Sequence, residues 1–565
     1  MRLLKASRTM RLIVLLAALA LVLAACPAPA PAQPGAAPAA QEAAPAAAAP
    51  AASAEKVLNI LYWQAASLPN NHLSGGTKDA DAAAITLESL ASISPEGALV
   101  AKLAEDIPTV ENGGVSEDLT TITWKLKQGV KWSDGSDFTS ADLLFTYAYC
   151  SDEATGCTNI EQFDGVSSIE APDDHAVVIT FDNPTPYPYV AFVTSAGHIL
   201  NAAQFADCIG TAAQTCSEQN LAPLGTGPYR LIDFKVNDVA TYERNPEWRG
   251  EPAYFDKVVF KGGGDAASAA RAVLETGEAD YAWNLQVEPQ ILIEMESKGL
   301  GEIIVSKGGN VERILINQTN PDPALGDMRA EYDDGNNPHP FLTFKPIPQA
   351  MSMAIDRSII ATQLYGFAGA PTCNIIPAPP YYASTANDSC LTQDMEGAKK
   401  LLDDNGVVDT NGDGIREYNG IPLYVRYQTS VNPVREKTQA LIKQWWKELG
   451  IDTELINIDA GVYFGGDPNS PDTYQKFFTD VEMYTTGPAI DPQLHLASYQ
   501  CEFIPNKANV WAGGNIPRGC NPEYDELFRQ LTTTPVGPDR EAIVKQLNDI
   551  NVQNSYQIPL VHRGS

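Results

Sequence analysis

The first 54 residues are composed so that they cannot join a folded core, which confines the fold to the rest of the chain. Four basic residues within the first eleven positions precede an apolar run over residues 12–23. That run is too short to span a bilayer as a stable helix, and its flanks are those of a cleaved export signal. Residues 27–54 then contain 16 Ala and 7 Pro, which is typical of extended, semi-rigid chain. The sequence therefore predicts a signal peptide over residues 1–25 and a tether within residues 26–54.

The apolar run closes on Leu23, Ala24, Ala25 and Cys26. Small residues before a cysteine resemble the bacterial lipobox, in which the cysteine is lipidated and becomes the new N-terminus. Cys26 is thus the expected lipid anchor, and the protein is expected outside the cytoplasm, attached to the cell membrane on its periplasmic side or at the cell surface. A plain secreted protein with a disordered start is the alternative.

Eight further cysteines fall in four couples that are close in sequence: Cys150 and Cys157, Cys208 and Cys216, Cys373 and Cys390, Cys501 and Cys520. Eight cysteines allow on the order of 100 pairings, and the sequence alone does not choose among them. Disulfides between neighbours are the simplest arrangement, and they suit an oxidising compartment. No Cys-x-x-Cys motif or Cys/His cluster has zinc-ligand spacing, so zinc is not expected.

The net charge of −32 at pH 7 disfavours nucleic acid and anionic lipid as direct partners, because both would be repelled. Catalytic signatures are also missing: there is no G-x-S-x-G, no H-E-x-x-H, no phosphate-binding G-K-S/T and no G-x-G-x-x-G. Adjacent acidic residues in polar loops are more typical of solvated surface than of a glycosidase pair. The chain is therefore not expected to be an enzyme.

One loop carries plausible metal chemistry. Asp409, Asn411 and Asp413, followed by Gly414, match the first half of an EF-hand loop. The match fails at its twelfth position, where Gly420 replaces a bidentate glutamate. Calcium bound by the three oxygen-bearing side chains and a tight polar turn remain the two interpretations, and no other cofactor is expected.

Strand and helix patterns alternate along the rest of the chain. Strands are predicted at residues 57–63 and 177–181 and a hairpin at residues 122–132. Helices are predicted at residues 266–277, 289–298, 347–365, 398–404, 433–449, 523–532 and 539–551, and a further one opens near residue 140. This mixture predicts an α/β fold.

Several segments, in one order along the chain, resemble the peptide/nickel (cluster C, family 5) class of solute-binding proteins that serve ABC importers. They are residues 124–142, 225–229, 245–249, 270–284, 354–357, 409–417 and 432–436. The resemblance covers essentially all of residues 56–562. It implies a two-lobed, periplasmic-binding-protein type II-like fold with an extra accessory domain.

The resemblance also implies a division of the chain. Lobe I would comprise residues 55–90, 222–315 and 540–565, the accessory domain residues 91–221, and lobe III residues 316–539. Chains of this family continue beyond the second lobe crossing, so the resemblance makes Ser565 an early end.

Ligand-binding residues follow from the resemblance position by position. The cleft would be lined by Gln64, Ala65, Ala66, Trp283, Asn284, Tyr484, Gly487, Asp491, Trp511 and Asn515. Peptide receptors of this class hold the ligand's ammonium with an aspartate shortly before an Asp/Glu-Pro pair. Here Asp491 and Pro492 are recognisable, but residues 487–490 carry no acid. A cleft without that acid should not favour free peptide N-termini, because a buried unpaired ammonium is costly; if the ligand is a zwitterionic peptide, Asp491 is the expected acid.

The expected function is therefore that of a monomeric, lipid-anchored receptor. It would bind a peptide or related small solute between two lobes and deliver it to ABC permease subunits. A secreted hydrolase and a surface adhesin are the alternatives; the first would form products from peptides or glycans, and the second would bind matrix without lobe closure.

Overall fold

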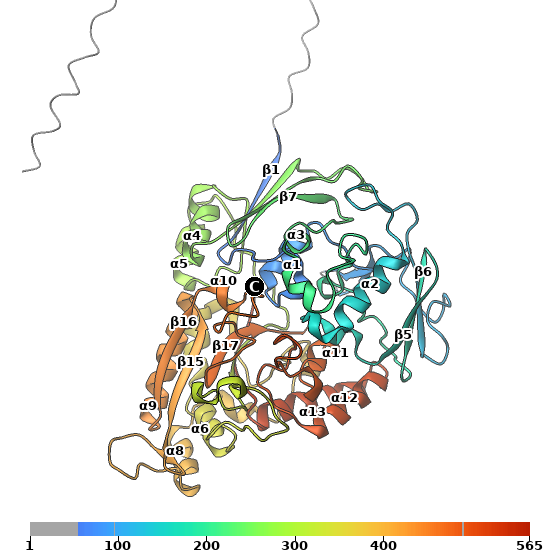
Figure 1. Ribbon diagram of the computed structural model, residues 1–565. Helices are drawn as coiled ribbons and strands as arrows, with labels where there is room; N and C mark the ends of the chain where they lie inside the picture. Colours follow the sequence, from blue (N-terminus) through green and yellow to red (C-terminus); the bar gives the residue numbers. More distant parts are fainter. Residues whose placement is uncertain (1–54, 95–96, 489–490, 565) are drawn as a thin grey trace, which may run out of the picture. The chain divides into compact units, whose positions relative to one another are not determined.

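A five-stranded sheet gathers segments that are distant in the sequence. In the computed structural model, which describes residues 55–94, 97–488 and 491–564, its strand order is β10 (Tyr281–Trp283), β1 (Val57–Tyr62), β9 (Lys257–Gly262), β8 (Val239–Arg244) and β7 (Tyr229–Lys235). β1 lies parallel to both of its neighbours. The strand predicted at residues 57–63 is thus an inner strand of this sheet, next to the edge strand β10 (Figure 1).

A six-stranded sheet organises the later part of the chain. Its order is β12 (Gly369–Pro371), β18 (Gln557–Arg563), β11 (Val311–Ile316), β17 (Val481–Thr486), β15 (Tyr424–Ser430) and β16 (Asp452–Ile458). Every residue of β11 is buried, as expected for a strand covered on both faces. Helix α9 (Pro433–Glu448) begins at the cap residue Asn432, whose side chain accepts from Val434 and Arg435 N–H. In Figure 1 it lies beside β15 and β16.

A third sheet belongs to the expected accessory segment. Its order is β4 (Thr121–Lys125), β6 (Ala176–Phe181) and β5 (Val166–Asp173). The hairpin predicted at residues 122–132 is wrong, because β4 pairs with β6 and not with the residues that follow it. Two smaller pairs join β2 (Ala91–Ile93) to β3 (Leu99–Ala101) and β13 (Glu417–Tyr418) to β14 (Ile421–Pro422).

The other α-helices are α1 (Thr77–Ala83), α2 (Ser140–Ser151), α3 (Ser217–Leu221), α4 (Ala266–Arg271), α5 (Pro289–Glu296), α6 (Pro346–Met353), α7 (Arg357–Ile360), α8 (Met395–Asp404), α10 (Ala460–Tyr463), α11 (Gln493–Ala497), α12 (Pro522–Thr533) and α13 (Pro538–Gln553). The long helix predicted at residues 347–365 is divided between α6, α7 and a π-helical turn. The Asp356 side chain starts α7 by accepting from Ile359 N–H, which ends the preceding helix.

All eight cysteines outside the leader form disulfides with their sequence neighbours: Cys150–Cys157, Cys208–Cys216, Cys373–Cys390 and Cys501–Cys520. Each bridge spans no more than 19 residues and fastens a local loop. The predicted signal peptide, the tether and Cys26 lie outside the described residues.

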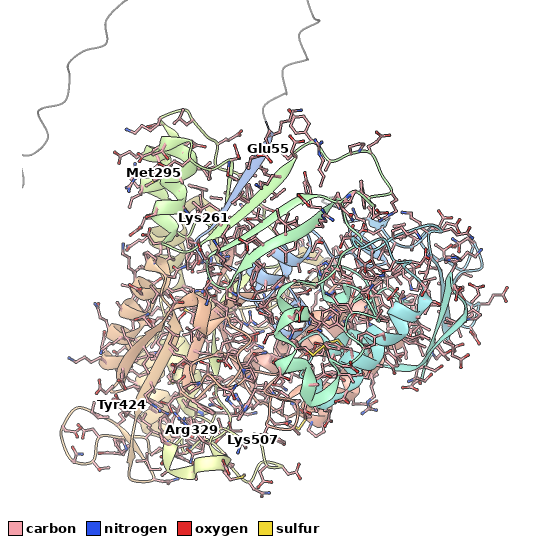
Figure 2. The ribbon with its side chains drawn as sticks, turned by 45° about the horizontal axis from the view of Figure 1, so that its top comes forward. Glu55, Lys261, Met295, Arg329, Tyr424 and Lys507 are labelled. Atoms are coloured by element: carbon pink, nitrogen blue, oxygen red, sulfur yellow. A yellow bond between two sulfur atoms is a disulfide. The ribbon has the colours of Figure 1, made fainter. Side chains whose placement is uncertain are left out.

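The strands of each sheet can be compared with the segments expected to form each lobe. Residues of the five-stranded sheet all fall in the segments assigned to lobe I, and β4, β5 and β6 fall in the accessory segment. Residues 540–565 are also expected in lobe I, whereas β18 pairs with β11 and β12 in the six-stranded sheet. In Figure 2, Glu55 and Lys261 mark the first sheet, and Tyr424, Arg329 and Lys507 lie at the far end of the second.

Candidate functional site

A cavity of about 570 Å³ lies between the ends of the two large sheets. Gln64 follows β1, and Trp283 and Asn284 end β10, so the carboxyl ends of two parallel strands supply one side. Arg313 of β11 and Tyr484 of β17 supply the other side. Ligands of open α/β sheets bind at such carboxyl ends, and the volume lies in the range of small-molecule sites.

Six of the residues expected in the cleft line this cavity: Gln64, Trp283, Asn284, Tyr484, Gly487 and Asp491. Four others lie elsewhere. Ala65 and Ala66 are buried beside the first sheet, where a Cβ on Gly262 would meet the Ala65 Cα at 2.1 Å. Trp511 packs edge-on against Phe478.

Asn515 is the fourth residue outside the lining. Its amide donates to the carbonyls of Tyr499, Gln500 and Gly519 at 2.9–3.0 Å. This side chain therefore fixes the loop around the Cys501–Cys520 bridge and has no donor left for a ligand.

Trp283 and Asn284 are held from several directions. The Trp283 ring stacks on Tyr62 at 4.8 Å. Asn284 adopts a left-handed φ of 56°, and its carbonyl accepts from Trp63 Nε1 at 2.9 Å. Its side-chain Oδ1 accepts from Arg563 Nη2 at 2.7 Å. The end of β10 is thereby tied to β18 of the other sheet.

Two more contacts cross from the segment after β10 to helix α9. Gln286 accepts a hydrogen bond from Asn432, and Glu288 pairs with Lys437. These side chains join the segment after β10 to the first turns of α9, and a motion that separates the two segments would have to break the contacts.

The lining of the cavity includes two carboxyl groups, those of Asp81 and Glu161, that have no cationic partner within the described part of the chain. Asp81 of α1 accepts from Tyr62 OH at 2.9 Å, and burial raises the pKa of Asp81 to about 6. Glu161, in the 3-10 turn Ile160–Phe163 of the accessory segment, is 5% exposed. Burial raises the pKa of Glu161 to about 7, and Oε1 has no hydrogen-bond partner among the described atoms.

The lining also includes three buried arginines, Arg313, Arg435 and Arg563. Arg435 pairs with Glu312, its Nε donating to Oε1 at 2.8 Å. Arg313 donates to Thr486 O and Oγ1 and to Tyr499 OH, and it lies over the Tyr484 ring. Within the residues that the structure describes, no carboxylate pairs with Arg313 or Arg563, and the Nε atom of each is without a partner.

Asp491 is not available as a free acid. Its two carboxylate oxygens accept from Arg540 Nη2 at 3.0 and 3.1 Å. The Arg540 side chain is fully buried, and it also donates to the carbonyl of Leu531. The charge of Asp491 is therefore already compensated by the protein. Nearby His495 adds no positive charge, because burial lowers its pKa to about 3.

A larger groove of about 1580 Å³ adjoins the cavity. Neighbouring residues line the two spaces, for example Gly487 the cavity and Pro488 the groove. In the groove, Glu88 and Arg249 neutralise each other at 2.7 Å. The smaller cavity is the better candidate site because its charged groups are buried and incompletely paired, whereas those of the groove are paired or solvated.

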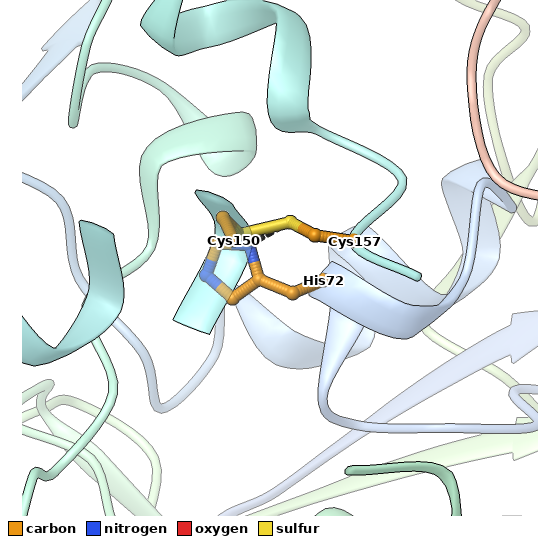
Figure 3. A group of neighbouring side chains, drawn as sticks. All are labelled: His72, Cys150 and Cys157. Atoms are coloured by element: carbon orange, nitrogen blue, oxygen red, sulfur yellow. Dashed lines mark hydrogen bonds between the residues drawn. A yellow bond between two sulfur atoms is a disulfide. The ribbon is translucent and has the colours of Figure 1, made fainter. Parts of the chain in front are cut away.

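A histidine and one disulfide form the closest cluster of potential metal ligands in the described residues. His72 Nδ1 lies 3.5 and 3.8 Å from the sulfurs of Cys150 and Cys157 (Figure 3). The sulfurs are bonded to each other, so neither is a thiolate that could ligate a metal. His72 Nε2 contacts the His198 carbonyl at 2.6 Å, and burial lowers the pKa of His72 to about 4. The cluster is structural.

The loop at Asp409 is exposed and outside the cavity. Asp409 accepts from the N–H groups of Asn411, Gly412 and Gly414, and Glu417 accepts from the Thr410 N–H and the Asn411 amide. Such bonds suit both a polar turn and an oxygen-rich loop, and calcium at Asp409, Asn411 and Asp413 stays a prediction.

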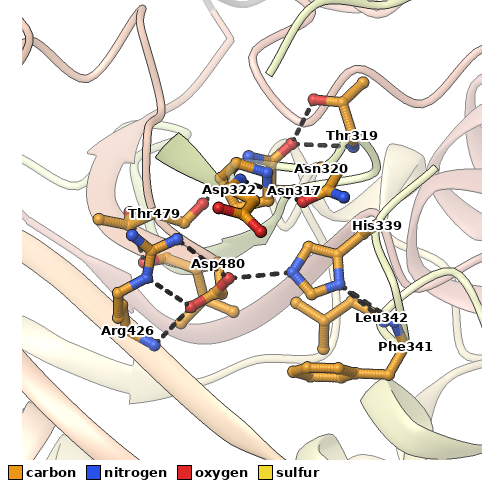
Figure 4. A network of polar contacts seen from close by, with 12 residues as sticks. Asn317, Thr319, Asn320, Asp322, His339, Phe341, Leu342, Arg426, Thr479 and Asp480 are labelled. Atoms are coloured by element: carbon orange, nitrogen blue, oxygen red, sulfur yellow. Dashed lines mark hydrogen bonds and ion pairs between the residues drawn. The ribbon is translucent and has the colours of Figure 1, made fainter. Parts of the chain in front are cut away.

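Another buried network supports the far end of the six-stranded sheet. His339 Nε2 donates to Asp480 at 3.0 Å while its Nδ1 accepts from Leu342 N–H, and Asp480 also pairs with Arg426 (Figure 4). Both nitrogens are used, and burial lowers the pKa of His339. These residues do not line the cavity and hold the loops together.

Sequence reasoning missed Asp81, Glu161 and the three arginines. A signal existed for Arg313: Glu312 and Arg313 interrupt an otherwise apolar strand, and buried charges in such a place mark ion pairs or binding sites. The sequence contains no such signal for Glu161, because its place in the cavity depends on how the accessory segment packs against the rest of the chain.

The chain matches a known family over most of its length. Residues 98–496 match the family described as bacterial extracellular solute-binding proteins, family 5 Middle. A putative ABC transporter peptide-binding protein of Brucella ovis is 26% identical over 372 residues, covering 63% of this chain and 65% of the relative. The match thus spans slightly less than two thirds of that protein.

Solved structures show the same fold. The oligopeptide-binding protein AppA of Bacillus subtilis, in complex with a nonapeptide, has a TM-score of 0.74 at 18% identity, covering 90% of this chain and 94% of that one. NikZ of Campylobacter jejuni, in complex with Ni(L-His), has a TM-score of 0.72 at 19% identity, covering 90% and 92%. The predicted α/β, two-lobed periplasmic-binding-protein fold is confirmed. Among the described residues, none of the helices has both the length and the apolar character needed to cross a bilayer.

Proposed function

We propose that this chain, which belongs to the bacterial extracellular solute-binding proteins of family 5, is the substrate-binding receptor of an ABC importer. It binds a peptide or a related small solute between its two lobes and delivers it to the permease subunits. The observation that carries the proposal is the cavity, since it lies between the two sheets and is lined from both.

The geometry suits capture without covalent chemistry. Aromatic and polar groups converge on a cavity of small-molecule size, and a few side-chain contacts between the segment after β10 and the six-stranded sheet close its edge. A ligand that contacts both sides adds to these contacts only when the lobes are together, so binding shifts the population toward the closed form.

The location of such a receptor follows from the leader. We infer that the signal directs export, that lipidated Cys26 anchors the protein, and that the Ala/Pro tether keeps the lobes within reach of the permease. The receptor acts as a monomer, because one chain contributes both sides of the cavity.

Binding and closure test the proposal together. A mixed tripeptide library is titrated calorimetrically into the purified protein, and small-angle X-ray scattering is recorded with and without it. The expected result is saturable binding accompanied by a smaller radius of gyration. Release of cleaved products would favour a hydrolase, and matrix binding without a change in radius would favour an adhesin.

A further inference from the structure

We propose that the contact between residues 160–165 of the accessory segment and residues 491–532 of the second lobe, which is built on the six-stranded sheet, is a pH-sensitive latch. It closes when the carboxyl groups at the contact take up protons, and it opens as the pH rises. The latch rests on the proposed function, because it sets the pH range in which the receptor holds its ligand. It acts on closure of the lobes, whatever the chemistry of the solute.

The contact joins parts of the chain that belong to different sheets. β1 precedes the accessory segment and β7 follows it, so both of its ends lead into the five-stranded sheet. Residues 491–532 instead lie between β17 and β18 of the six-stranded sheet. A motion that moves the two sheets apart as rigid bodies therefore also separates the accessory segment from these residues.

Two acidic side chains of the accessory segment lie in this contact. Glu161 is 5% exposed, and a Cβ added to Gly514 would lie 2.9 Å from its Oε1. Asp164 Oδ2 accepts from Gln500 Nε2 at 2.8 Å. Both acids also line a small cavity between the segment and helices α11 and α12. The second lobe thus supplies the surface that keeps water from both carboxyl groups.

Two further acids approach Asp164 from the second lobe. Asp525 of α12 accepts from the Cys501 N–H at 3.2 Å. Glu502 is exposed, and the charges of Asp164 and Asp525 both act on it. Among the residues that the structure describes, neither these three acids nor Glu161 form an ion pair. Closing the contact is therefore costly while all four are ionised, because like charges repel one another strongly where water is excluded.

Positive groups on the elements packed around the contact are already used or neutral. Arg529 of α12 pairs with Glu526 at 2.6 Å, and Arg540 pairs with Asp491. Burial lowers the pKa of His495 on α11 to about 3, so its ring is neutral. The other titratable groups that face the contact in the described chain are tyrosines and another acid: Tyr147, Tyr187, Tyr474 and Asp182.

Proton uptake on closure follows from these surroundings. Burial raises the pKa of Glu161 to about 7 in the closed form. It also raises the pKa of Asp164, Glu502 and Asp525. When the lobes separate, water returns to the carboxyl groups and their pKa values fall back. The closed form is therefore favoured most below the ordinary glutamate pKa of 4.5, and this advantage is lost as the pH rises through about 7.

The experiment measures ligand affinity against pH. A tripeptide library without ionisable side chains, acetylated at the N-terminus and amidated at the C-terminus, is titrated calorimetrically into the protein from pH 5.5 to pH 8. The ligand then has no group that titrates in this range. Glu161→Gln removes the buried acid, and Asp164→Asn changes a residue that does not line the ligand cavity. Glu170→Gln and Asp207→Asn, at exposed positions of the accessory segment, are the matched controls.

The wild type should bind more weakly as the pH rises. A pKa that moves from 4.5 to about 7 on closure weakens the affinity by about thirtyfold between pH 5.5 and pH 8 when binding requires closure. Most of this dependence should disappear in Glu161→Gln and part of it in Asp164→Asn, whereas the control variants should follow the wild type. Titrations in two buffers of different ionisation enthalpy should show proton uptake by the wild type near pH 6 and much less by Glu161→Gln.

Other outcomes overturn the latch. An affinity that is the same at every pH, or that falls equally in Glu161→Gln and the wild type, refutes it and leaves the receptor function standing. Asp164→Asn decides alone if Glu161→Gln does not fold. If no peptide binds at any pH in protein that keeps its melting transition, the peptide-receptor function is contradicted, and the ligand-free protein decides the latch. Its radius of gyration, from small-angle X-ray scattering, should then be larger at pH 8 than at pH 5.5, and equal radii refute the latch.

Discussion

At the scale of single residues, the cavity is lined by Glu161 and Arg313, neither of which forms an ion pair among the described residues. Glu161 shows the cost of this arrangement. A carboxyl group whose pKa is higher in the folded than in the unfolded chain destabilises the fold as the pH rises, because the unfolded chain releases its proton first.

Glu161→Gln should therefore stabilise the ligand-free protein at alkaline pH. The pKa of Glu161 is about 7 when folded, against an ordinary 4.5, so the wild type loses up to about 3 kcal/mol between pH 4.5 and pH 8. We expect the variant to melt a few degrees higher at pH 8 and at the same temperature near pH 4.5. Scanning calorimetry after unfolding and refolding, to remove bound solute, measures this. If the melting temperatures of the wild type and the variant changed equally with pH, the prediction would be contradicted. The control is Glu218→Gln at an exposed position, which should melt like the wild type at every pH.

Asp491→Asn should act on stability more than on recognition. It leaves the buried Arg540 without its carboxylate, which costs about 3–5 kcal/mol when one partner of a buried pair is removed. The check is a urea or thermal unfolding curve, with exposed Asp539→Asn as the neighbouring control. An unchanged curve together with lost binding of free-amine peptides would instead make Asp491 the ligand's acid.

The residue scale also shows what sequence could predict. Gln64 and Trp283 lie at the carboxyl ends of the parallel strands β1 and β10. The family resemblance placed both in the cleft, whereas the strand pattern alone predicted β1 and not β10. The position of Glu161 depends on contacts such as that between Asp164 and Gln500, 336 residues apart. No local pattern contains such information.

At the scale of helices and strands, sequence motifs predicted the structure correctly where the motif and the element it determines lie in the same segment. The capping box formed by Thr139 and Asp142 starts α2 close to the predicted position. The false hairpin at residues 122–132 shows the limit: alternation identifies a strand, but the partner of β4 is β6, about 50 residues later. The break between α6 and α7 likewise depends on an Asp356 cap that competes with a continuous helix.

The end of β17 leads to a prediction about packing. A Cβ at Gly487 would lie 2.2 Å from the Gly309 carbonyl oxygen, where the cavity and the groove meet. Gly487→Ala must push these backbones apart, and such overpacking costs about 1–3 kcal/mol. We expect a melting temperature lower by a few degrees.

Gly308→Ala is the matched control for this prediction, because a Cβ added at Gly308 would meet no atom of another segment within 4 Å. It should melt like the wild type. Equal melting temperatures for the two variants would show that the segments move apart freely.

At the scale of the whole molecule, the proposed lipid anchor rests on a single residue, Cys26, which lies outside the described residues. Cys26→Ser should release the protein from membranes, because a lipid chain contributes about 0.8 kcal/mol per buried CH₂ and the described helices include none that could insert. Fractionation at high salt with immunodetection measures this, and Ala28→Ser serves as the control. A Cys26→Ser protein that still sediments with membranes would refute the anchor.

The position of β18 has a consequence for secretion. This strand, residues 557–563, lies between β11 and β12 inside the six-stranded sheet. One of the two neighbours of β11 is therefore synthesised about 240 residues after β11 itself. A chain that crosses a translocation pore from its N-terminus cannot complete this sheet while residues 557–563 are still on the inner side. The order of strands therefore delays folding of the second lobe until β18 has crossed, and the preceding polypeptide stays unfolded until then.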